Sequence, residues 1–248
     1  SGVILLTEWP FGLTKSLPTK RAYVERSFFA MGTIVRISAY GESHAHVNHA
    51  INRAIAEIQR VDEMMSLYRP TSQIVRVNSA AGKESIKIDT DLIGVVQKAK
   101  TYNEMTEGFF DITVEPLMDL WGFRSEAASL KKVPSDREIQ RRLDAVGFHH
   151  IYVDAGNQAI GLDHSASRID LGGIAVGYSV DLAVRALQSE GIDAAFINHS
   201  GDAYALGTPD GDEGWSVGIP NPGRPDEILA SLTLRDKAIS TSGGYEKF

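Results

Sequence analysis

The chain has 248 residues, of which 43% are hydrophobic and 23% are charged, proportions that are typical of globular domains. It contains no cysteine, which excludes a disulfide framework, a thiolate metal site and a cysteine nucleophile. The net charge of −7 argues against a nucleic-acid partner, and no apolar run is long enough to predict a membrane-spanning helix.

The N-terminal part changes its hydrophobic pattern twice. We predict residues 1–27 to form a peripheral arm, because prolines interrupt this stretch and it shows no clear period. Apolar and polar residues then alternate over residues 28–40, which predicts a half-buried strand. From His46 to Met65 the apolar residues recur at steps of three and four, which predicts a helix with one buried stripe.

Further helices are predicted over residues 91–105, 135–147 and 175–190. The second of these begins with a capping box, in which Ser135 and Glu138 can satisfy each other's backbone N–H groups. We expect its apolar residues Ile139 and Leu143 to face the core.

Short strands are predicted between and after these helices, over residues 150–154, 158–162, 167–171, 194–198, 215–219, 230–234 and 237–240. The strands do not alternate strictly with the helices, so a layered α+β domain fits better than a doubly wound parallel sheet. No repeat or linker is visible, and we therefore predict a single domain over residues 28–248.

Two histidine-bearing segments resemble a metal site and a catalytic triad. For both, a structural role without chemistry is the favoured interpretation. His46 and His49 would share a helix face with the spacing of metal ligands, yet Glu42 is the only nearby acidic residue, which favours a solvated surface. The run from His199 to Asp202 contains the three residue types of a catalytic triad. The residues of a catalytic triad come together in the folded protein and are not neighbours in the sequence. The G-x-S-x-G turn of many serine hydrolases is also missing, so this activity is not favoured.

Three loops combine glycines with polar or aromatic residues. The loop at residues 170–178 joins a predicted strand to a helix through two glycines, so the helix start could bind a phosphate. The loop at 241–245 places two hydroxyls beside two glycines, and the segment 108–123 mixes aromatic rings with acidic groups. Each segment alone is also compatible with a turn or with a core strand entering a helix. Together they suggest a ligand with both rings and phosphates.

Five motifs occur in an order that resembles the ApbE family of FAD:protein FMN transferases. They are Met31-Gly32-Thr33, Tyr68 to Asn78, Phe110 to Val114 with Leu120 to Phe123, Asp170 to Tyr178 with Asp181, and Thr241-Ser242-Gly243 with Tyr245. The resemblance runs from about Phe28 to Phe248 and implies a single T-fold-like α+β domain with mostly antiparallel sheets packed with helices. It also implies Mg²⁺-dependent transfer of FMN from FAD to a threonine or serine of a target flavoprotein, with release of AMP.

The resemblance also assigns site residues. It implies that Met31 and Tyr68 flank the isoalloxazine ring, which suits a thioether and a phenol. It implies that the Gly173 carbonyl is a Mg²⁺ ligand, in keeping with the preference of this ion for oxygen. The remaining residues that it places at FAD are Phe109, Phe110, Asp111, Asp170, Val176, Thr241 and Ser242.

The chain departs from the family pattern in three ways. Val176 stands where a lysine or another polar residue is common, and Gln73 stands where glutamate is usual. The family's H-x-[IL]-D-P-x-T-G and D-x-x-x-T segments have no counterpart before Phe248. We therefore expect these 248 residues to be a fragment of a longer protein that lacks the family's C-terminal metal-binding segment. Transferase activity of this fragment by itself is in doubt.

Two alternatives to the transferase stay open at this stage. One is a non-catalytic FAD-binding protein for flavin storage or electron transfer, and the other is an FAD pyrophosphatase. The resemblance further implies a location in the periplasm or on the outward face of the cytoplasmic membrane, with a possible membrane tether in the full-length protein.

Overall fold

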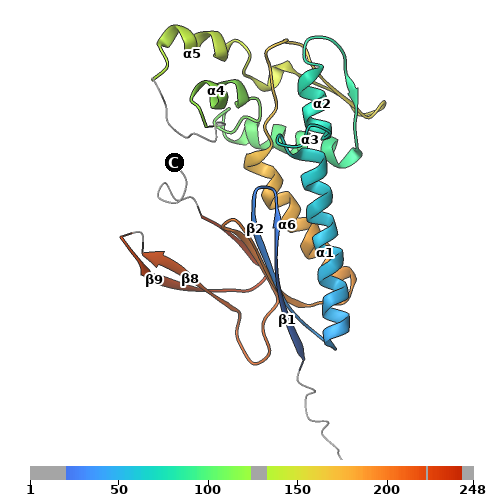
Figure 1. Ribbon diagram of the computed structural model, residues 1–248, viewed down its shortest axis with the longest axis vertical. Helices are drawn as coiled ribbons and strands as arrows, with labels where there is room; N and C mark the ends of the chain where they lie inside the picture. The colour runs from blue at the N-terminus through green and yellow to red at the C-terminus, as the bar shows by residue number, and fades with distance from the viewer. Residues whose placement is uncertain (1–20, 124–132, 222, 242–248) are drawn as a thin grey trace, which may run out of the picture.

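A computed structural model describes residues 21–123, 133–221 and 223–241, arranged as an elongated molecule (Figure 1). Its helices are α1 (His44–Met65), α2 (Gln73–Ser79), α3 (Thr90–Met105), α4 (Glu115–Leu120), α5 (Asp136–Leu143), the short 3₁₀ helix η1 (Phe148–His150) and α6 (Gly172–Ser189). Its strands are β1 (Ala22–Ala30), β2 (Thr33–Gly41), β3 (Ile86–Lys87), β4 (Ile151–Asp154), β5 (Ala159–Leu162), β6 (Ala194–His199), β7 (Asp202–Leu206), β8 (Trp215–Asn221), β9 (Arg224–Leu234) and β10 (Lys237–Ser240).

The lower half of the molecule is built on an antiparallel sheet with the strand order β1-β2-β6-β7-β10. Helices α1 and α6 lie side by side against this sheet (Figure 1). Alternate residues of β2 and β6, such as Ile37 and Ile197, are fully buried under the helices. This burial of one sheet face against an apolar helix stripe forms the first hydrophobic core.

The upper half contains a second hydrophobic core. It gathers residues of α2, α3 and the small sheet β3-β5-β4, together with the C-terminal end of α1 and the N-terminal end of α6. Both long helices thus run from one core into the other: Ile58 of α1 lies in the first and Val61 in the second. Met31 packs against both cores, so it marks the level at which they meet.

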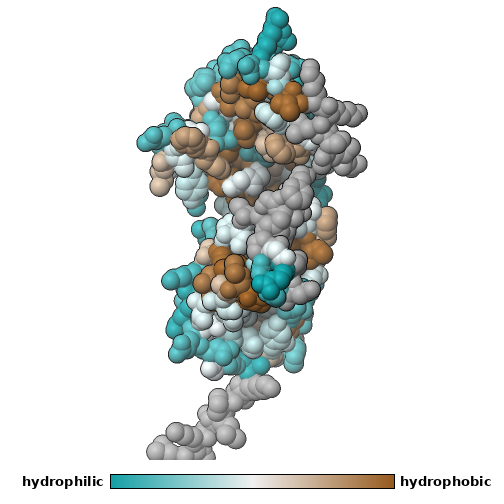
Figure 2. Space-filling model, turned by 90° about the vertical axis from the view of Figure 1, so that its left-hand side faces the viewer, coloured by the Kyte–Doolittle hydropathy of each residue, from teal (hydrophilic) through white to brown (hydrophobic). Residues whose placement is uncertain are grey.

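Strands β8 and β9 form a separate two-stranded ribbon that projects from the sheet (Figure 1). At its base, the Trp215 ring lies 5.7 Å from Phe196 and 6.0 Å from Tyr40, between ring centroids. Farther out, Ile228 and Leu229 are exposed. Figure 2 views the molecule from this side and shows hydrophobic patches on both its upper and its lower half.

The prediction of an α+β fold with mostly antiparallel sheets is confirmed, because every pairing among the described strands is antiparallel. The predicted helices at 46–65, 91–105 and 175–190 are present as α1, α3 and α6. No described helix is both long and apolar enough to cross a bilayer.

The N-terminal boundaries differ from the prediction. Strand β1 begins at Ala22, so residues 22–27 belong to the sheet and not to the predicted arm. The single strand predicted over 28–40 is a hairpin, because Met31 (φ 49°) and Gly32 (φ 78°) form a two-residue turn between β1 and β2. Positive φ at both central residues is the geometry that joins antiparallel strands most tightly.

Other predicted elements are also corrected. Helix α5 keeps its capping box but ends at Leu143, which is 40% exposed, and none of its residues is buried. Residues 167–171 are not a strand, and neither are residues 108–114, which form turns before α4. Helix α2 and strands β3 and β7 were not predicted. Helix α2 has seven residues and β3 has two, which is too short to show a period, whereas β7 is as long as strands that were predicted.

Candidate functional site

Two pockets lie on opposite sides of the first two turns of α6. Gly172 and Val176 face the first, which we call the Met31 pocket, and Gly173 and Gly177 face the second, the Tyr178 pocket. The Met31 pocket has a volume of about 500 Å³ and the Tyr178 pocket about 480 Å³. The N-terminal end of α6 is therefore the wall that the two pockets share.

The Met31 pocket is formed by segments that are far apart in the sequence. Its lining comes from the β1–β2 turn, the end of α1 and the loop after it, α4, and the start of α6: Met31, Asp62, Met65, Ser66, Leu67, Tyr68, Met118, Phe123, Asp170, Gly172, Ala175 and Val176. Tyr68 is 76% exposed, and its phenol ring is thus accessible at the rim. An aromatic ring and several thioethers around an open pocket suit a flat, polarizable ligand.

Asp170 is held in this pocket by the backbone on either side of it. The buried Asn78 amide donates to the Ile169 carbonyl (2.9 Å) and accepts from the Ile169 N–H (2.7 Å). The Asp170 N–H donates to the carbonyl of Ile112 (2.7 Å), and its carboxylate accepts from the N–H of Gly172 (2.8 Å). Asp170 thus links a fixed loop to the first residue of α6.

The start of α6 has features of an anion-binding site. Leu171 at the N-cap has no side-chain acceptor, and the first turn contains no acidic residue. The first two helical residues are glycines, and a Cβ on Gly173 would come within 3.1 Å of the Phe110 ring. The 18-residue helix begins here, so its free N–H groups and the positive end of its dipole are directed toward the space between the pockets.

A carboxylate at the Met31 pocket is already neutralised. Asp62 on α1 is buried and accepts two hydrogen bonds from Arg69, from Nε (2.8 Å) and from one terminal nitrogen (2.5 Å). The bond to Asp62 raises the pKa of Arg69 above its ordinary value, so the guanidinium keeps its charge beside this carboxylate. Sequence inspection missed Asp62 and Met118 as pocket residues, because no motif singled out either of them.

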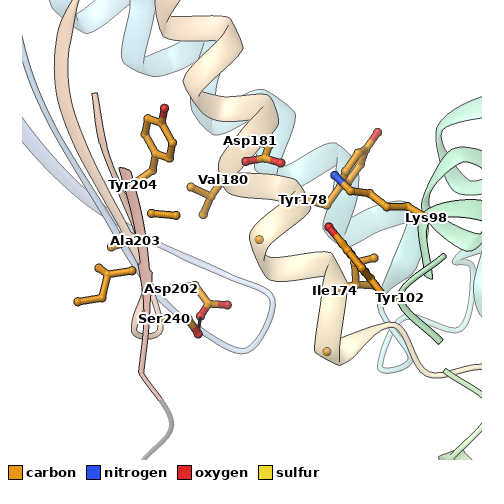
Figure 3. A pocket seen from close by; sticks show the side chains of 14 residues that line it. Lys98, Tyr102, Ile174, Tyr178, Val180, Asp181, Asp202, Ala203, Tyr204 and Ser240 are labelled. Carbon is orange, nitrogen blue, oxygen red and sulfur yellow. Dashed lines mark hydrogen bonds between the residues drawn. The ribbon is translucent and has the colours of Figure 1, made fainter. Parts of the chain in front are cut away.

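The Tyr178 pocket opens between α3, α6 and the sheet (Figure 3). Lys98, Tyr102 and Tyr178 lie on one side of it, and Asp202, Tyr204 and Ser240 lie on the sheet side (Figure 3). The Ser240 hydroxyl donates to the Asp202 carboxylate (2.6 Å). Burial, followed by the charge of Asp91, raises the pKa of Tyr178, which keeps its phenol protonated at neutral pH.

The structure divides the predicted site residues between these pockets. Met31, Tyr68, Asp170 and Val176 line the Met31 pocket, and Gly173 lines the Tyr178 pocket. Val176 adds an apolar wall at the position where a polar residue is usual.

The other predicted residues that the structure describes, Phe109, Phe110, Asp111 and Thr241, do not line either pocket. The Phe109 side chain is 95% exposed, and Phe110 packs against the second core beside Gly173. Asp111 accepts from the N–H (2.7 Å) and the hydroxyl (2.6 Å) of Thr113, so its carboxylate stabilises its own turn. Thr241 is bonded to the Gly201 carbonyl, and Ser242 lies outside the described residues.

Gln73, which replaces a glutamate, has a structural role. Its side-chain oxygen accepts a hydrogen bond from the N–H of Asp89 (2.7 Å), the N-cap residue of α3. An amide oxygen serves this contact as well as a carboxylate would, so the substitution leaves the link between α2 and α3 intact.

The histidine segments occupy structural positions. His46 lies against the Glu190 carbonyl (2.6 Å) and His49 against the Glu190 carboxylate (3.4 Å), at the end of α6. Ser200 (φ 57°) and Gly201 (φ 92°) form the tight turn between β6 and β7. Ser200 is therefore a turn residue, and the ring of His199 contacts Ser179 instead.

The described residues do not form a complete magnesium site. They contain no group of three or more histidine, aspartate or glutamate side chains placed to hold a metal ion. The Gly173 carbonyl is one oxygen ligand, whereas Mg²⁺ demands an octahedral set. The described residues alone therefore do not supply the oxygen shell of a Mg²⁺ ion.

Comparison with known proteins gives consistent matches. A profile of the ApbE family matches residues 31–248. The chain is 32% identical over 192 residues to a FAD:protein FMN transferase of Vibrio cholerae, and 26% identical over 221 residues to one of Klebsiella pneumoniae. These alignments cover 77% and 88% of this chain, and 57% and 65% of the two relatives.

Solved structures agree with the sequence matches. The chain superimposes on the ApbE protein of Thermotoga maritima with a TM-score of 0.80 at 30% identity. It superimposes on the flavin transferase ApbE of Vibrio cholerae with a TM-score of 0.78 at 31% identity. Each superposition covers 91% of this chain and 72% of the other. The chain thus spans less than two thirds of the length of the two curated relatives but nearly three quarters of these solved chains.

Proposed function

The chain belongs to the ApbE family, and we propose that it acts as a FAD:protein FMN transferase. In this reaction the FMN half of FAD is transferred to a threonine or serine of a target flavoprotein, and AMP leaves. The observation that carries the proposal is the position of the Met31 pocket directly beside the start of α6. A pocket for a flat ring and a helix start for a diphosphate are thereby adjacent.

The Met31 pocket would hold the flavin ring. Met31 and Tyr68 supply polarizable and aromatic contact surfaces, and the apolar wall includes Val176. Asp170 lies on the same pocket wall and is an acceptor, so it suits an N–H group of the ring or a ribityl hydroxyl.

The start of α6 would orient the diphosphate. Backbone N–H groups and the helix dipole stabilise the negative charge without a side-chain cation. The acceptor hydroxyl then attacks the phosphorus on the FMN side, the bond to the AMP phosphate breaks, and the hydroxyl proton is released. Because phosphoryl transfer depends mainly on positioning and charge stabilisation, the chain needs no nucleophile of its own.

Magnesium and the identity of the acceptor are parts of the proposal that rest on the family resemblance. Gly173 would contribute its carbonyl to the metal, and ligands outside the described residues would complete the shell. The acceptor is a flavoprotein with a threonine or serine at its modification site. An outward-facing location, with a possible membrane tether, also belongs to the proposal and can be checked with a reporter that is active only outside the cytoplasm.

The test incubates the protein with FAD, Mg²⁺ and a flavoprotein domain that carries an acceptor threonine. We expect an increase in acceptor mass equal to one FMN group, read by mass spectrometry, and an equal amount of AMP. The same domain with alanine in place of that threonine is the control. Release of free FMN and AMP without a mass increase would indicate a pyrophosphatase, and FAD binding without either product would indicate a non-catalytic flavin-binding protein.

Replacing Tyr68 by alanine should weaken FAD binding about fivefold, because an aromatic contact of about 1 kcal/mol is lost. Tyr68 is largely exposed, so the free energy of unfolding should change little. Flavin fluorescence titration measures the affinity. Tyr68→Phe keeps the ring and should bind FAD nearly as the original chain does, whereas equal affinities for all three proteins would remove Tyr68 from the flavin site.

A further inference from the structure

His199 is a buried titratable residue that the proposed reaction does not use. It is the last residue of β6 and has no exposed surface, and its Nδ1 lies 3.1 Å from the Ser179 hydroxyl on α6. Among the described residues its other ring nitrogen, Nε2, makes no hydrogen bond of good geometry, and the backbone of Ala30 is the polar group nearest to a bonding position. A buried polar ring with one specific contact requires an explanation.

The contact between His199 and Ser179 has a defined direction. The Ser179 hydroxyl lies 2.7 Å from the carbonyl of Val176, and this oxygen can only accept. A hydroxyl has one proton, so Ser179 donates it to Val176 and accepts from the ring. With Ser179 donating to Val176, its contact with the ring requires a proton on Nδ1, and in this arrangement the donors run from His199 through Ser179 to Val176.

The surroundings favour the neutral ring. Burial lowers the pKa of His199 below its ordinary value, although the backbone of Ala30 and the carboxylates of Asp202 and Asp62 act to raise it. These groups come from β1, β7 and α1, and Asp62 is itself neutralised by Arg69. A neutral imidazole with its proton on Nδ1 is the form that the donor chain requires.

This chain of bonds ends at the wall of the Met31 pocket. Val176 lines that pocket, and the first turn of α6 gains no side-chain bond from its N-cap residue Leu171. The start of α6 is thus tied to the preceding loop through Asp170 and to the sheet through Ser179. We propose that His199 is a positioning residue, which holds the ligand-facing end of α6 in place by donating a hydrogen bond to Ser179.

The first test measures hydrogen exchange of the amides at residues 172–179, which needs no ligand. His199→Phe keeps a ring of similar shape but cannot donate, and Ser179→Ala removes the acceptor. Each should raise the exchange rate in this segment about fivefold, the effect of losing one hydrogen bond, while amides in the middle of α1 stay unchanged. His199→Asn, whose amide nitrogen can occupy the place of Nδ1, should restore most of the protection.

The second test measures FAD affinity by fluorescence and rests on the proposed function. His199→Phe and Ser179→Ala should each weaken binding about fivefold, and the double variant should be no weaker, because both changes break the same link. Additive losses would show that the residues act independently. Since Ser179→Ala is a small change, it keeps the test usable if the His199→Phe protein does not fold.

Two outcomes would overturn the proposal: unchanged exchange at 172–179 in both variants, or equal loss in His199→Asn and His199→Phe. Equal loss in His199→Asn and His199→Phe would mean that the His199 ring only fills space. If the unsubstituted chain binds no FAD, the proposed function fails, but the exchange measurement still decides the role of His199.

Thermal unfolding against pH gives a further prediction. The pKa of His199 is lower in the folded than in the unfolded chain, so the unfolded chain binds the proton first as pH falls. The neutral ring contributes its full stability above about pH 6.5, the ordinary pKa of histidine, which applies in the unfolded chain. This contribution is lost as pH falls from there toward the lower pKa of His199 in the folded chain. His199→Asn should show a weaker pH dependence of Tm over this range, and an unchanged profile would contradict the assignment.

Discussion

Replacing Asn78 by alanine is expected to lower the free energy of unfolding by about 3 kcal/mol, the largest effect on stability that we predict. The Asn78 side chain is buried and makes two hydrogen bonds with the backbone of Ile169. Alanine leaves both the N–H and the carbonyl of Ile169 without these partners in a site that water does not reach. Urea denaturation followed by circular dichroism measures the loss.

Two controls separate the bonds from the general effect of a substitution. Asn78→Asp keeps an acceptor for the Ile169 N–H but places a buried carboxylate oxygen against the Ile169 carbonyl, so it should be at least as destabilising as alanine. Asn52→Ala removes an exposed asparagine on α1 and should change the free energy of unfolding by about 0.5 kcal/mol or less. A cost for Asn78→Ala no greater than that of Asn52→Ala would show that the Ile169 backbone finds other partners.

Replacing Asp170 by alanine should weaken FAD binding about thirtyfold, which corresponds to the loss of about 2 kcal/mol from a hydrogen bond to a charged acceptor. The carboxylate lines the Met31 pocket and also accepts from the N–H of Gly172. Its removal therefore takes away an acceptor for the ligand and loosens the first residue of α6. Flavin fluorescence titration gives the affinity ratio.

The matched control for Asp170 is asparagine, which keeps an oxygen at the same place without the charge. Its loss of affinity should be smaller than that of alanine. Asparagine should leave the unfolding free energy close to that of the original chain, and alanine should lower it by about 1 kcal/mol, because it removes the acceptor of the Gly172 N–H while the backbone bond to Ile112 is kept. A large loss of stability with normal affinity in the folded fraction would assign Asp170 a structural role only.

The long helices could be read from the sequence because each has a periodic apolar stripe, and α1 and α3 also have a local start signal. In α1 the Ser43 hydroxyl accepts from the N–H of His46, and in α3 Asp89 accepts from the N–H of Asp91. These signals act over one helical turn, so the local sequence contains them completely. The same reasoning gave a wrong prediction for α5, where the apolar residue Leu143 is exposed. An apolar stripe does not show whether another element packs against it.

The irregular segments were predicted less well for a related reason. Residues 167–171 have the composition of a strand, but their backbone bonds go to the Asn78 side chain and to the carbonyl of Ile112. Both partners are distant in the sequence. Where hydrogen-bond partners lie far away, alternation of apolar residues cannot distinguish a strand from a fixed loop.

The candidate site was predicted in part. Met31, Tyr68, Asp170 and Val176 were chosen from motifs and share one pocket in the structure. Met118 and Asp62 also line that pocket, but they lie in the helices α4 and α1 and no motif singled out either of them. Gly173, one residue from Gly172, faces the other pocket, because successive residues of a helix point about 100° apart.

The sequence by itself determined the fold class, the long helices, most strands and the family, since periodicity, caps and motif order are properties of short stretches of chain. Only the tertiary structure decided that α1 and α6 cross between two cores, that a pocket lies on each side of α6, and that His199 contacts Ser179. The physical reason is that a pocket and a buried hydrogen bond join side chains from distant segments, whose meeting depends on how the whole chain packs.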